Sequence, residues 1–275
     1  MPMPSELHHI DANGLRFAYL EEGRGPLVLL LHGFPDTAHT WDHVRPLIAA
    51  KGYRAVSPWT RGYAPTAIPE RDADLETLAR DALALIEALG ETSAIVIGHD
   101  WGAGTAYAAA SLDPARVTKL FVIGIPHTAT VRPGPLMLWK VRHFLAYKWR
   151  GAARRFAKDD FAALPAIYKR WSPAWTPDPE EFAAIRETFR DPASLDAAFG
   201  YYRQLRFRPQ PFLRRPIEVP TVVFAGLDDV IVKPADYHRA ARMFSAGYIV
   251  DEMRGGHFMH REHPAEFAEK LLTHL

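Results

Sequence analysis

The sequence predicts an α/β fold built on a mostly parallel β-sheet. Two observations indicate this: short, continuous apolar runs recur along the 275 residues, and segments of helical periodicity lie between them. Continuous apolar runs are typical of strands buried on both faces, and their alternation with helices favours a parallel sheet. Six runs are expected to be strands of this kind: 27–32, 53–58, 93–99, 117–125, 221–226 and 248–253.

The chain is expected to begin with a β-hairpin, which brings the number of strands to eight. Residues 8–14 and 15–23 alternate apolar and polar side chains more regularly, and Asn13-Gly14 between them is a strong two-residue turn signal. Further along, residues 75–89 repeat apolar side chains at three- and four-residue spacing, as an amphipathic helix does. A second helix is expected directly after the strand at 93–99, over residues 101–112.

Residues 127–215 interrupt this alternation. The segment contains four tryptophans and no obvious buried strand, and its 17 Lys and Arg outnumber 8 Asp and Glu. Because ligands bind at the carboxyl edge of the strands in open α/β folds, we expect residues 127–215 to form a helical lid over that edge. The core domain is then residues 1–126 and 216–275. The basic surplus has two interpretations, a solvated surface and attraction of substrate.

Composition excludes several kinds of partner and chemistry. The net charge of +1 gives no long-range field for nucleic acid or an anionic membrane, and the absence of cysteine excludes disulfides and thiol catalysis. The N-terminal residues lack a signal-peptide apolar segment, and no run reaches the about 18 apolar residues of a membrane span. We therefore expect a cytoplasmic protein without a membrane span, and we leave a homodimer open.

Asp100 lies where the sequence predicts a sharp strand-to-helix turn. It follows the strand at 93–99 and precedes a helix, with Gly98 and Gly102 two residues to either side. Such a turn, the nucleophile elbow, presents its central side chain to the site, and the helix N-terminus keeps a carboxylate ionised. The alternative interpretation is an ordinary helix N-cap aspartate.

Residues elsewhere in the chain match the other parts of a hydrolase site built around a nucleophile elbow. Phe34 follows the strand at 27–32, so its backbone N–H and that of Trp101 can converge on one oxygen as an oxyanion hole. His257 follows the last strand, and the order Asp100, acid, His257 is that of the hydrolase triad. Asp229 is the expected acid, which would orient His257 as a general base, and Asp228 is its rival.

No cofactor or metal is expected. His257, His260 and His263 are spaced by three residues, and steps of three turn through about 300° on a helix, so the side chains fan out. The His-Glu-x-x-His pattern of zinc hydrolases is also missing.

Four motifs together resemble the epoxide hydrolase branch of the α/β-hydrolase superfamily: HGFPD at 32–36, RGYAPT at 61–66, GHDWGAG at 98–104 and GGHF at 255–258. The resemblance covers nearly the whole chain and implies the α/β-hydrolase fold. It implies Asp100 as nucleophile, His257 as base and Asp229 as its partner. It also implies a cis peptide bond before Pro35.

The resemblance further implies two lid tyrosines that hold and protonate the epoxide oxygen. Phe199-Gly200-Tyr201-Tyr202-Arg203 is similar to the family's Tyr-Arg motif, which makes Tyr202 one donor. For the other lid tyrosine, an ungapped comparison with the family pattern places His143 at the expected position, and Tyr147 lies one helical turn later. The expected pocket-lining residues are Phe34, Trp101, His143 and Trp149.

An aspartate at position 100 predicts chemistry different from that of a serine. A carboxylate is ionised at neutral pH and can displace a leaving group from saturated carbon, which makes an ester on the protein. Water activated by His257 then attacks the ester carbonyl, and the Phe34 and Trp101 amides hold the oxyanion. The aromatic side chains expected around the site favour a small apolar epoxide as substrate, with water as the second reactant.

Two alternatives remain open. A haloalkane dehalogenase uses the same nucleophile, and Trp101 resembles its halide-holding tryptophan, although Phe34 stands where many such enzymes have asparagine. A hydrolase-fold protein that binds an apolar ligand without turning it over is the second alternative. A serine esterase is disfavoured because position 100 cannot form an acyl-serine.

Overall fold

The computed structural model describes residues 6–131, 139, 142–149, 151–206 and 208–275. Its centre is an eight-stranded sheet in the order β1-β2-β4-β3-β5-β6-β7-β8. Strands β1 and β2 are antiparallel to their neighbours, and all other pairs are parallel. The strands are β1 (Leu7–Ala12), β2 (Leu15–Glu22), β3 (Leu27–Leu31), β4 (Arg54–Pro58), β5 (Ala94–His99), β6 (Val117–Ile123), β7 (Thr221–Gly226) and β8 (Tyr248–Met253).

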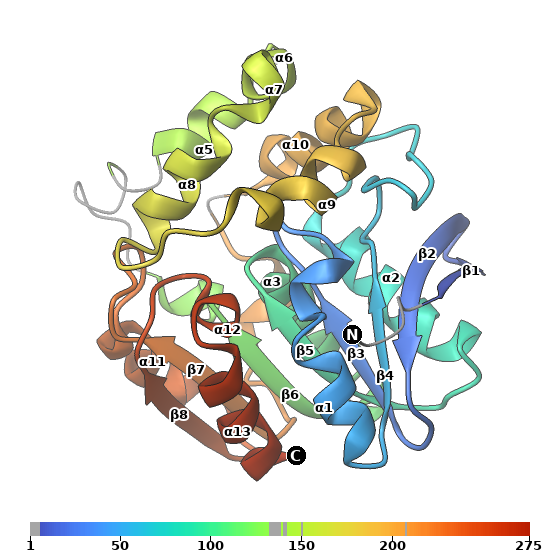
Figure 1. Cartoon of the computed structure of the whole chain (residues 1–275). Coiled ribbons are helices and arrows are strands. Elements are labelled where there is room, and N and C mark those ends of the chain that lie inside the picture. Colours follow the sequence, from blue (N-terminus) through green and yellow to red (C-terminus); the bar gives the residue numbers. More distant parts are fainter. Residues whose placement is uncertain (1–5, 132–138, 140–141, 150, 207) are drawn as a thin grey trace.

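Helices cover both faces of the sheet, as the continuous apolar strands predict. In β3, Leu29 and Leu31 belong to the core cluster shared with α2 (Leu75–Ala88) and α3 (Trp101–Leu112). Val28 and Leu30 belong to the cluster on the other face, with α1 (Arg45–Ala50) and α13 (Pro264–His274). Figure 1 shows the two helix layers with the sheet between them. The α/β fold with its mostly parallel eight-stranded sheet is therefore confirmed.

The N-terminal hairpin is also confirmed, and one strand differs from its prediction. Asn13 and Gly14 both have positive φ, 46° and 72°, as the tight turn between β1 and β2 requires. The run at 248–253 was expected to be buried on both faces. It is β8, at the edge of the sheet, where only Met253 is buried and Ile249 is 48% exposed. An edge strand has a neighbour on one side only, so part of its surface stays uncovered.

A group of helices lies between β6 and β7, and we refer to these six as the inserted helices. They lie over the edge at which the parallel strands end, above the sheet in Figure 1. Tyr168 of this group donates a hydrogen bond to Asp36, just after β3. The inserted helices are α5 (Arg142–Tyr147), α6 (Ala152–Phe156), α7 (Lys158–Phe161), α8 (Leu164–Trp171), α9 (Ala183–Thr188) and α10 (Pro192–Gln204).

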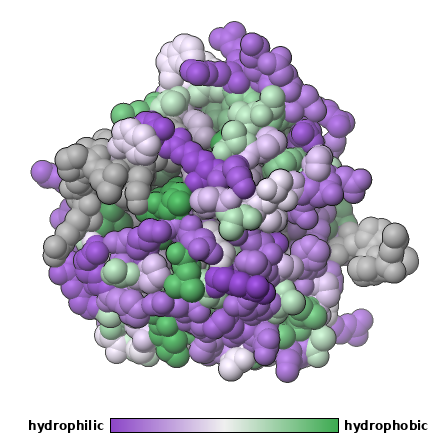
Figure 2. Space-filling view, turned by 60° about the vertical axis from the view of Figure 1, so that its left-hand side comes forward, coloured by the Kyte–Doolittle hydropathy of each residue, from purple (hydrophilic) through white to green (hydrophobic). Residues whose placement is uncertain are grey.

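The surface seen in Figure 2 is mainly hydrophilic, with hydrophobic side chains in smaller patches. Among the described residues, the helices are too short or too polar for any of them to traverse a lipid bilayer.

Candidate active site

Asp100 lies on a strained turn between β5 and α3. Its φ of 52° and ψ of −116° are unusual for a residue with a side chain. The glycines around it are required by close approach: a Cβ on Gly98 would lie 2.3 Å from the Gly102 carbonyl oxygen, and one on Gly102 would lie 2.1 Å from that of Leu31. The turn therefore has the shape that the glycine pattern predicts. Asp100 occupies the N-cap position of α3, but its side chain caps no backbone N–H of that helix, so it does not have the side-chain role of an ordinary N-cap aspartate.

The carboxylate of Asp100 is held in two directions. Oδ1 accepts a hydrogen bond of 2.9 Å from the Phe34 N–H, and Oδ2 lies 3.5 Å from Nε2 of His257. Burial would raise the pKa of Asp100, but His257 and the Phe34 N–H outweigh burial and hold this pKa below its usual value. Asp100 is therefore an ionised carboxylate although only 7% of it is exposed.

Asp229 lies on the other side of His257. Its Oδ2 is 3.2 Å from Nδ1 of the imidazole, and its Oδ1 accepts backbone hydrogen bonds from Ile231 and Val232. Asp228 turns away and accepts a hydrogen bond from the Gly255 N–H. Of the two rival aspartates, only Asp229 contacts the imidazole in the described structure.

His257 thus lies between two carboxylates, in the order predicted for a hydrolase triad. Burial would lower the pKa of His257, but Asp100 and Asp229 outweigh burial and raise it to about 10. The 3.5 Å separation from Asp100 is an ion-pair distance rather than a hydrogen bond. The imidazole is therefore protonated as long as both carboxylates keep their charge.

The structure brings Tyr147 and Tyr202 together. Their rings pack edge to face at 5.0 Å, and both contact Phe34, at 5.5 and 5.7 Å. Burial raises the pKa of both phenols, and the charge of Asp100 adds to the rise in each. Both phenols are consequently neutral donors within electrostatic reach of Asp100. The sequence alone left the position of Tyr147 undecided.

The surroundings of the carboxylate are largely aromatic. Trp101 packs edge to face against Tyr202 at 5.2 Å, and Phe34 is fully buried. Trp171, which the pocket prediction omitted, lies 5.3 Å from the His257 ring. Besides these, Phe144, Phe156 and Phe199 pack against the two tyrosines or Phe34.

Two of the predicted pocket residues are not placed in this group. Trp149 is 65% exposed and packs its ring over Gly151, so its assignment to the pocket is wrong. It follows the end of α5 and faces outward, whereas Tyr147, two residues earlier, faces Phe34. The His143 side chain lies outside the described part of the structure.

The loop after β3 supplies the backbone N–H of Phe34, which donates to the Asp100 carboxylate. The Phe34–Pro35 peptide bond is cis, as the resemblance implies, and a second cis bond that was not anticipated precedes Pro65. Gly33 is required here because a Cβ would lie 2.3 Å from the Cβ of Asp100. Trp101 is the first residue of α3, so its N–H has no acceptor within the helix.

One group of described side chains could hold a metal ion. Ligand atoms of Asp36, His99 and His260 lie within 4.8 Å of one another, and all three residues are buried. Asp36 already accepts hydrogen bonds from Thr40, Tyr168 and the Arg261 guanidinium. The negative charge of this carboxylate is therefore balanced within the protein.

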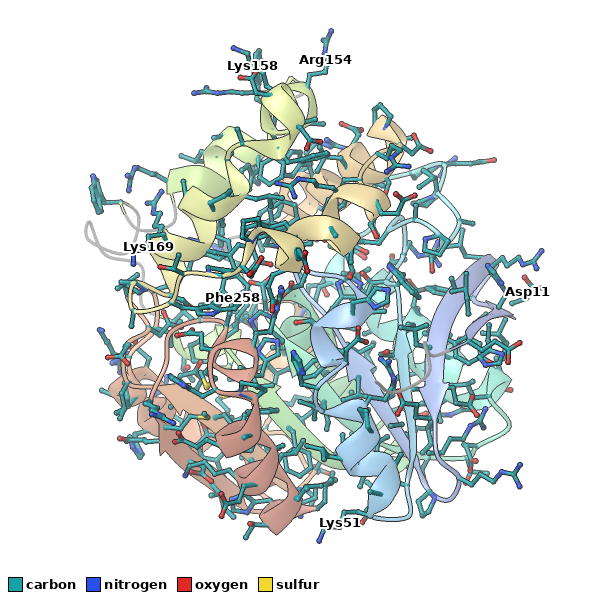
Figure 3. The ribbon with its side chains drawn as sticks, in the orientation of Figure 1. Asp11, Lys51, Arg154, Lys158, Lys169 and Phe258 are labelled. Carbon is teal, nitrogen blue, oxygen red and sulfur yellow. The ribbon has the colours of Figure 1, made fainter. Side chains whose placement is uncertain are left out.

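The basic surplus of the inserted helices lies partly at their outer surface. Figure 3 shows Arg154, Lys158 and Lys169 pointing away from the sheet, and all three are exposed. For these residues the structure favours the solvated-surface interpretation. Phe258, by contrast, lies between the inserted helices and the core in the same view.

The strand-turn-helix at Asp100, with Asp229 and His257 following in chain order on a mostly parallel sheet, defines an α/β hydrolase with aspartate in the nucleophile position. Comparison with known families agrees. The α/β hydrolase fold family matches residues 26–264, and the chain belongs to it.

Individual relatives narrow this assignment. The chain is 30% identical to the AB hydrolase superfamily protein YfhM of Bacillus subtilis, over 97% of this chain and 96% of that protein. It is 26% identical to Epoxide hydrolase A of Mycobacterium tuberculosis, again over 97% and 96%. The crystal structure of Epoxide Hydrolase A from Mycobacterium thermoresistibile shares the fold, with a TM-score of 0.84, 24% identity and 98% coverage of both chains. The relatives named epoxide hydrolases support the epoxide hydrolase branch of the superfamily, the branch that the motifs resemble.

Proposed function

We propose that this protein is an epoxide hydrolase that opens an apolar epoxide to a vicinal diol through a covalent ester on Asp100. The observation that carries the proposal is the pair of buried phenols, Tyr147 and Tyr202, that meet beside Phe34 near the carboxylate. An epoxide needs a hydrogen-bond donor on its oxygen as the ring opens, and a positioned phenol is such a donor. The names of several relatives support the same reaction.

In the first step, Oδ2 of Asp100 attacks an epoxide carbon and the carbon–oxygen bond of the ring breaks. We assign the attack to Oδ2 because the Phe34 N–H already holds Oδ1. One phenol gives its proton to the released oxygen, which becomes the first hydroxyl of the diol. The products are an ester on Asp100 and a tyrosinate, which receives a proton in turn from the imidazolium of His257.

The second step follows from the electrostatics of His257. The ester is neutral, so His257 loses one of the two charges that raise its pKa. The neutral imidazole, oriented by Asp229, can then take a proton from water while the hydroxide adds to the ester carbonyl. The alcohol leaves with that proton, and the acid form of Asp100 returns its own proton to His257.

The Phe34 N–H has a part in the second step as well. It holds the oxygen of Asp100 that becomes the ester carbonyl and then the oxyanion of the tetrahedral intermediate. The Trp101 N–H, at the start of α3, is the second proposed donor. We also propose that residues 127–215 are the lid, because the inserted helices supply both tyrosines.

The rival reaction is displacement of halide, and the two tyrosines favour the epoxide. A halide needs no proton, so the phenols would have no task in that reaction. Trp101, the indole that resembles a halide donor, packs edge to face against Tyr201 and Tyr202. A ligand-binding protein without turnover would not need the ion pairs of His257 with Asp100 and Asp229.

The test is covalent trapping. H257Q should form the ester and fail to hydrolyse it. Incubation with a panel of aryl and alkyl epoxides should therefore add the whole epoxide mass to Asp100, and haloalkanes in the same panel, which would add only their alkyl group as the halide leaves, should give no adduct. Intact-mass measurement and peptide mapping locate the adduct. The matched control is H238Q, which replaces an exposed imidazole paired with Glu252 and should turn over without trapping.

The outcomes separate the candidates. Adducts from epoxides alone support the proposal, and adducts from haloalkanes alone would make the protein a dehalogenase. An H257Q protein that binds panel members but forms no adduct with either class would contradict covalent catalysis.

A further inference from the structure

The loop that carries His257 is fixed by three successive backbone hydrogen bonds. The N–H groups of residues 256–258 donate, in order, to Glu262 Oε1 at 2.8 Å, to the Trp171 carbonyl at 3.1 Å and to Ser172 Oγ at 3.1 Å. Trp171 and Ser172 end α8, one of the inserted helices. Two of the three acceptors therefore come from outside the core.

Ser172 uses both capacities of its hydroxyl. It accepts from the Phe258 N–H and donates to Glu262, whose Oε1 also receives the Gly256 N–H. The Ser172 hydroxyl and the Glu262 carboxylate thus form a closed ring of hydrogen bonds with the loop that carries His257. Ser172 is fully buried, so water does not replace either bond in the folded protein.

Packing leaves this loop little freedom. A Cβ on Gly256 would lie 2.6 Å from Ser172 Cα and 2.7 Å from the Trp171 carbonyl oxygen. The Trp171 ring stands edge to face against His257. Ser172 and Trp171 are therefore in close contact with the backbone of the residue that precedes His257.

Neither Ser172 nor Glu262 has a described hydrogen bond to the nucleophile. Asp100 is held by its own turn and by the Phe34 N–H, and among the described contacts it meets the loop of His257 only through the imidazole and through His99, whose Nε2 lies 3.0 Å from the His257 carbonyl oxygen. We call the hydrogen-bonded pair Ser172 and Glu262 the clamp. Its hydrogen bonds hold the loop of His257 and not the turn of Asp100.

We propose that Ser172 and Glu262 are positioning residues that set the location of the His257 imidazole for hydrolysis of the ester. The inference rests on the proposed function, in which His257 is the base of the second step. It follows that loss of the clamp slows the second step and spares the first. A misplacement of a catalytic group by about 1 Å can lower a rate about 100-fold.

The experiment measures the two steps separately. Rapid-quench mixing with an epoxide that labels H257Q, followed by intact mass, gives the rates of ester formation and ester loss. S172A should lose the ester about 10- to 100-fold more slowly than the natural protein, with ester formation changed less than about threefold, so that ester accumulates. S111A is the matched control: its hydroxyl donates to Tyr107 within α3, away from the clamp, and both rates should stay unchanged.

Two variants of Glu262 test the same inference independently, in case S172A does not fold. E262A removes the acceptor of two donors and should give the same split between the steps, whereas E262Q keeps the Oε1 acceptor and should recover most of the hydrolysis rate. Imidazole NMR signals of His257 should move in S172A and E262A but not in E262Q. A hydrolysis rate equal to that of the natural protein in both S172A and E262A, or equal slowing of both steps, would overturn the inference. If H257Q itself traps no ester, the proposed function fails and the inference fails with it.

Discussion

Nε2 of His257 lies 3.5 Å from Oδ2 of Asp100, on the ring edge opposite the one that Asp229 contacts. The imidazole therefore joins two carboxylates that have different fates in the proposed reaction. Asp100 loses its charge when the ester forms, and Asp229 keeps its charge throughout. This difference lets one histidine be a cation before the first step and a base in the second.

Replacement of Asp100 by Asn should lower the pKa of His257 from its raised value of about 10. One of the two neighbouring charges is then gone, and burial, which lowers this pKa, is less opposed. NMR titration of the imidazole nitrogens in D100N and the natural protein measures the change. A His257 pKa that is the same in both proteins would show that Asp100 does not control the protonation of the histidine.

Replacement of Asp229 by Asn should slow ester hydrolysis by about 100- to 10,000-fold, because the imidazole loses the carboxylate that orients it and supports its cationic form. D228N is the matched control. Its side-chain oxygen can still accept the Gly255 N–H, so its rate should remain close to normal. Single-turnover decay of the ester gives both rates. Equal slowing in the two variants would point to a role of the loop as a whole.

Replacement of Tyr202 or Tyr147 by Phe should slow ester formation by about 100-fold or more, the usual scale for loss of a general acid. Hydrolysis of an ester that has already formed should change little. Y53F is the control, since the Tyr53 hydroxyl bonds only to the C-terminal Leu275 carbonyl among the described contacts. Stopped-flow or rapid-quench measurement of the first turnover gives the rate of ester formation in each variant. If either phenol can be removed without slowing ester formation, that tyrosine does not protonate the epoxide.

Stability should fall as the pH is lowered from 6.5 toward 4. Burial lowers the pKa of His32 and His127 to about 4, and a ring nitrogen of each accepts a backbone N–H. The unfolded chain takes up protons near its ordinary histidine pKa of about 6.5, while the folded chain does not. Acid therefore favours unfolding across this window, and no further loss from these groups is expected below it.

Denaturant unfolding at a series of pH values measures this slope. H127N is a suitable comparison, because Asn can keep the cap on the Ala129 N–H but does not titrate. The slope in H127N should be smaller by up to about 1.4 kcal/mol per pH unit. An identical slope in both proteins would show that His127 is protonated equally in the folded and unfolded states.

Much of the fold and the grouping of Asp100, Asp229 and His257 could be predicted from the sequence, because local patterns determine them. The strand before Asp100, the glycines around it and the helix after it are encoded in one continuous segment, residues 94–112. Continuous apolar strands gave the parallel sheet with helices on both faces, although they could not distinguish the edge strand β8 from a central one.

The remaining features depend on contacts between distant segments. Adjacent Asp228 and Asp229 have the same chemistry, and only the folded loop decides which one meets His257. Tyr147 and Trp149 are two residues apart near the end of α5, and packing against Phe34 places the first inside and leaves the second exposed. Ser172 contacts Phe258, next to His257 and 86 residues later in the chain, and no sequence motif predicts this contact.

The measurement that tests the central claim most directly is a single turnover in ¹⁸O-labelled water, with enzyme in excess over epoxide. If Oδ2 of Asp100 bonds to the substrate, the first diol carries an oxygen from the protein and contains no label. The peptide that contains Asp100 then gains one ¹⁸O atom. A labelled diol from the first turnover, with no label in that peptide, would mean that water attacks the epoxide directly and would contradict the account.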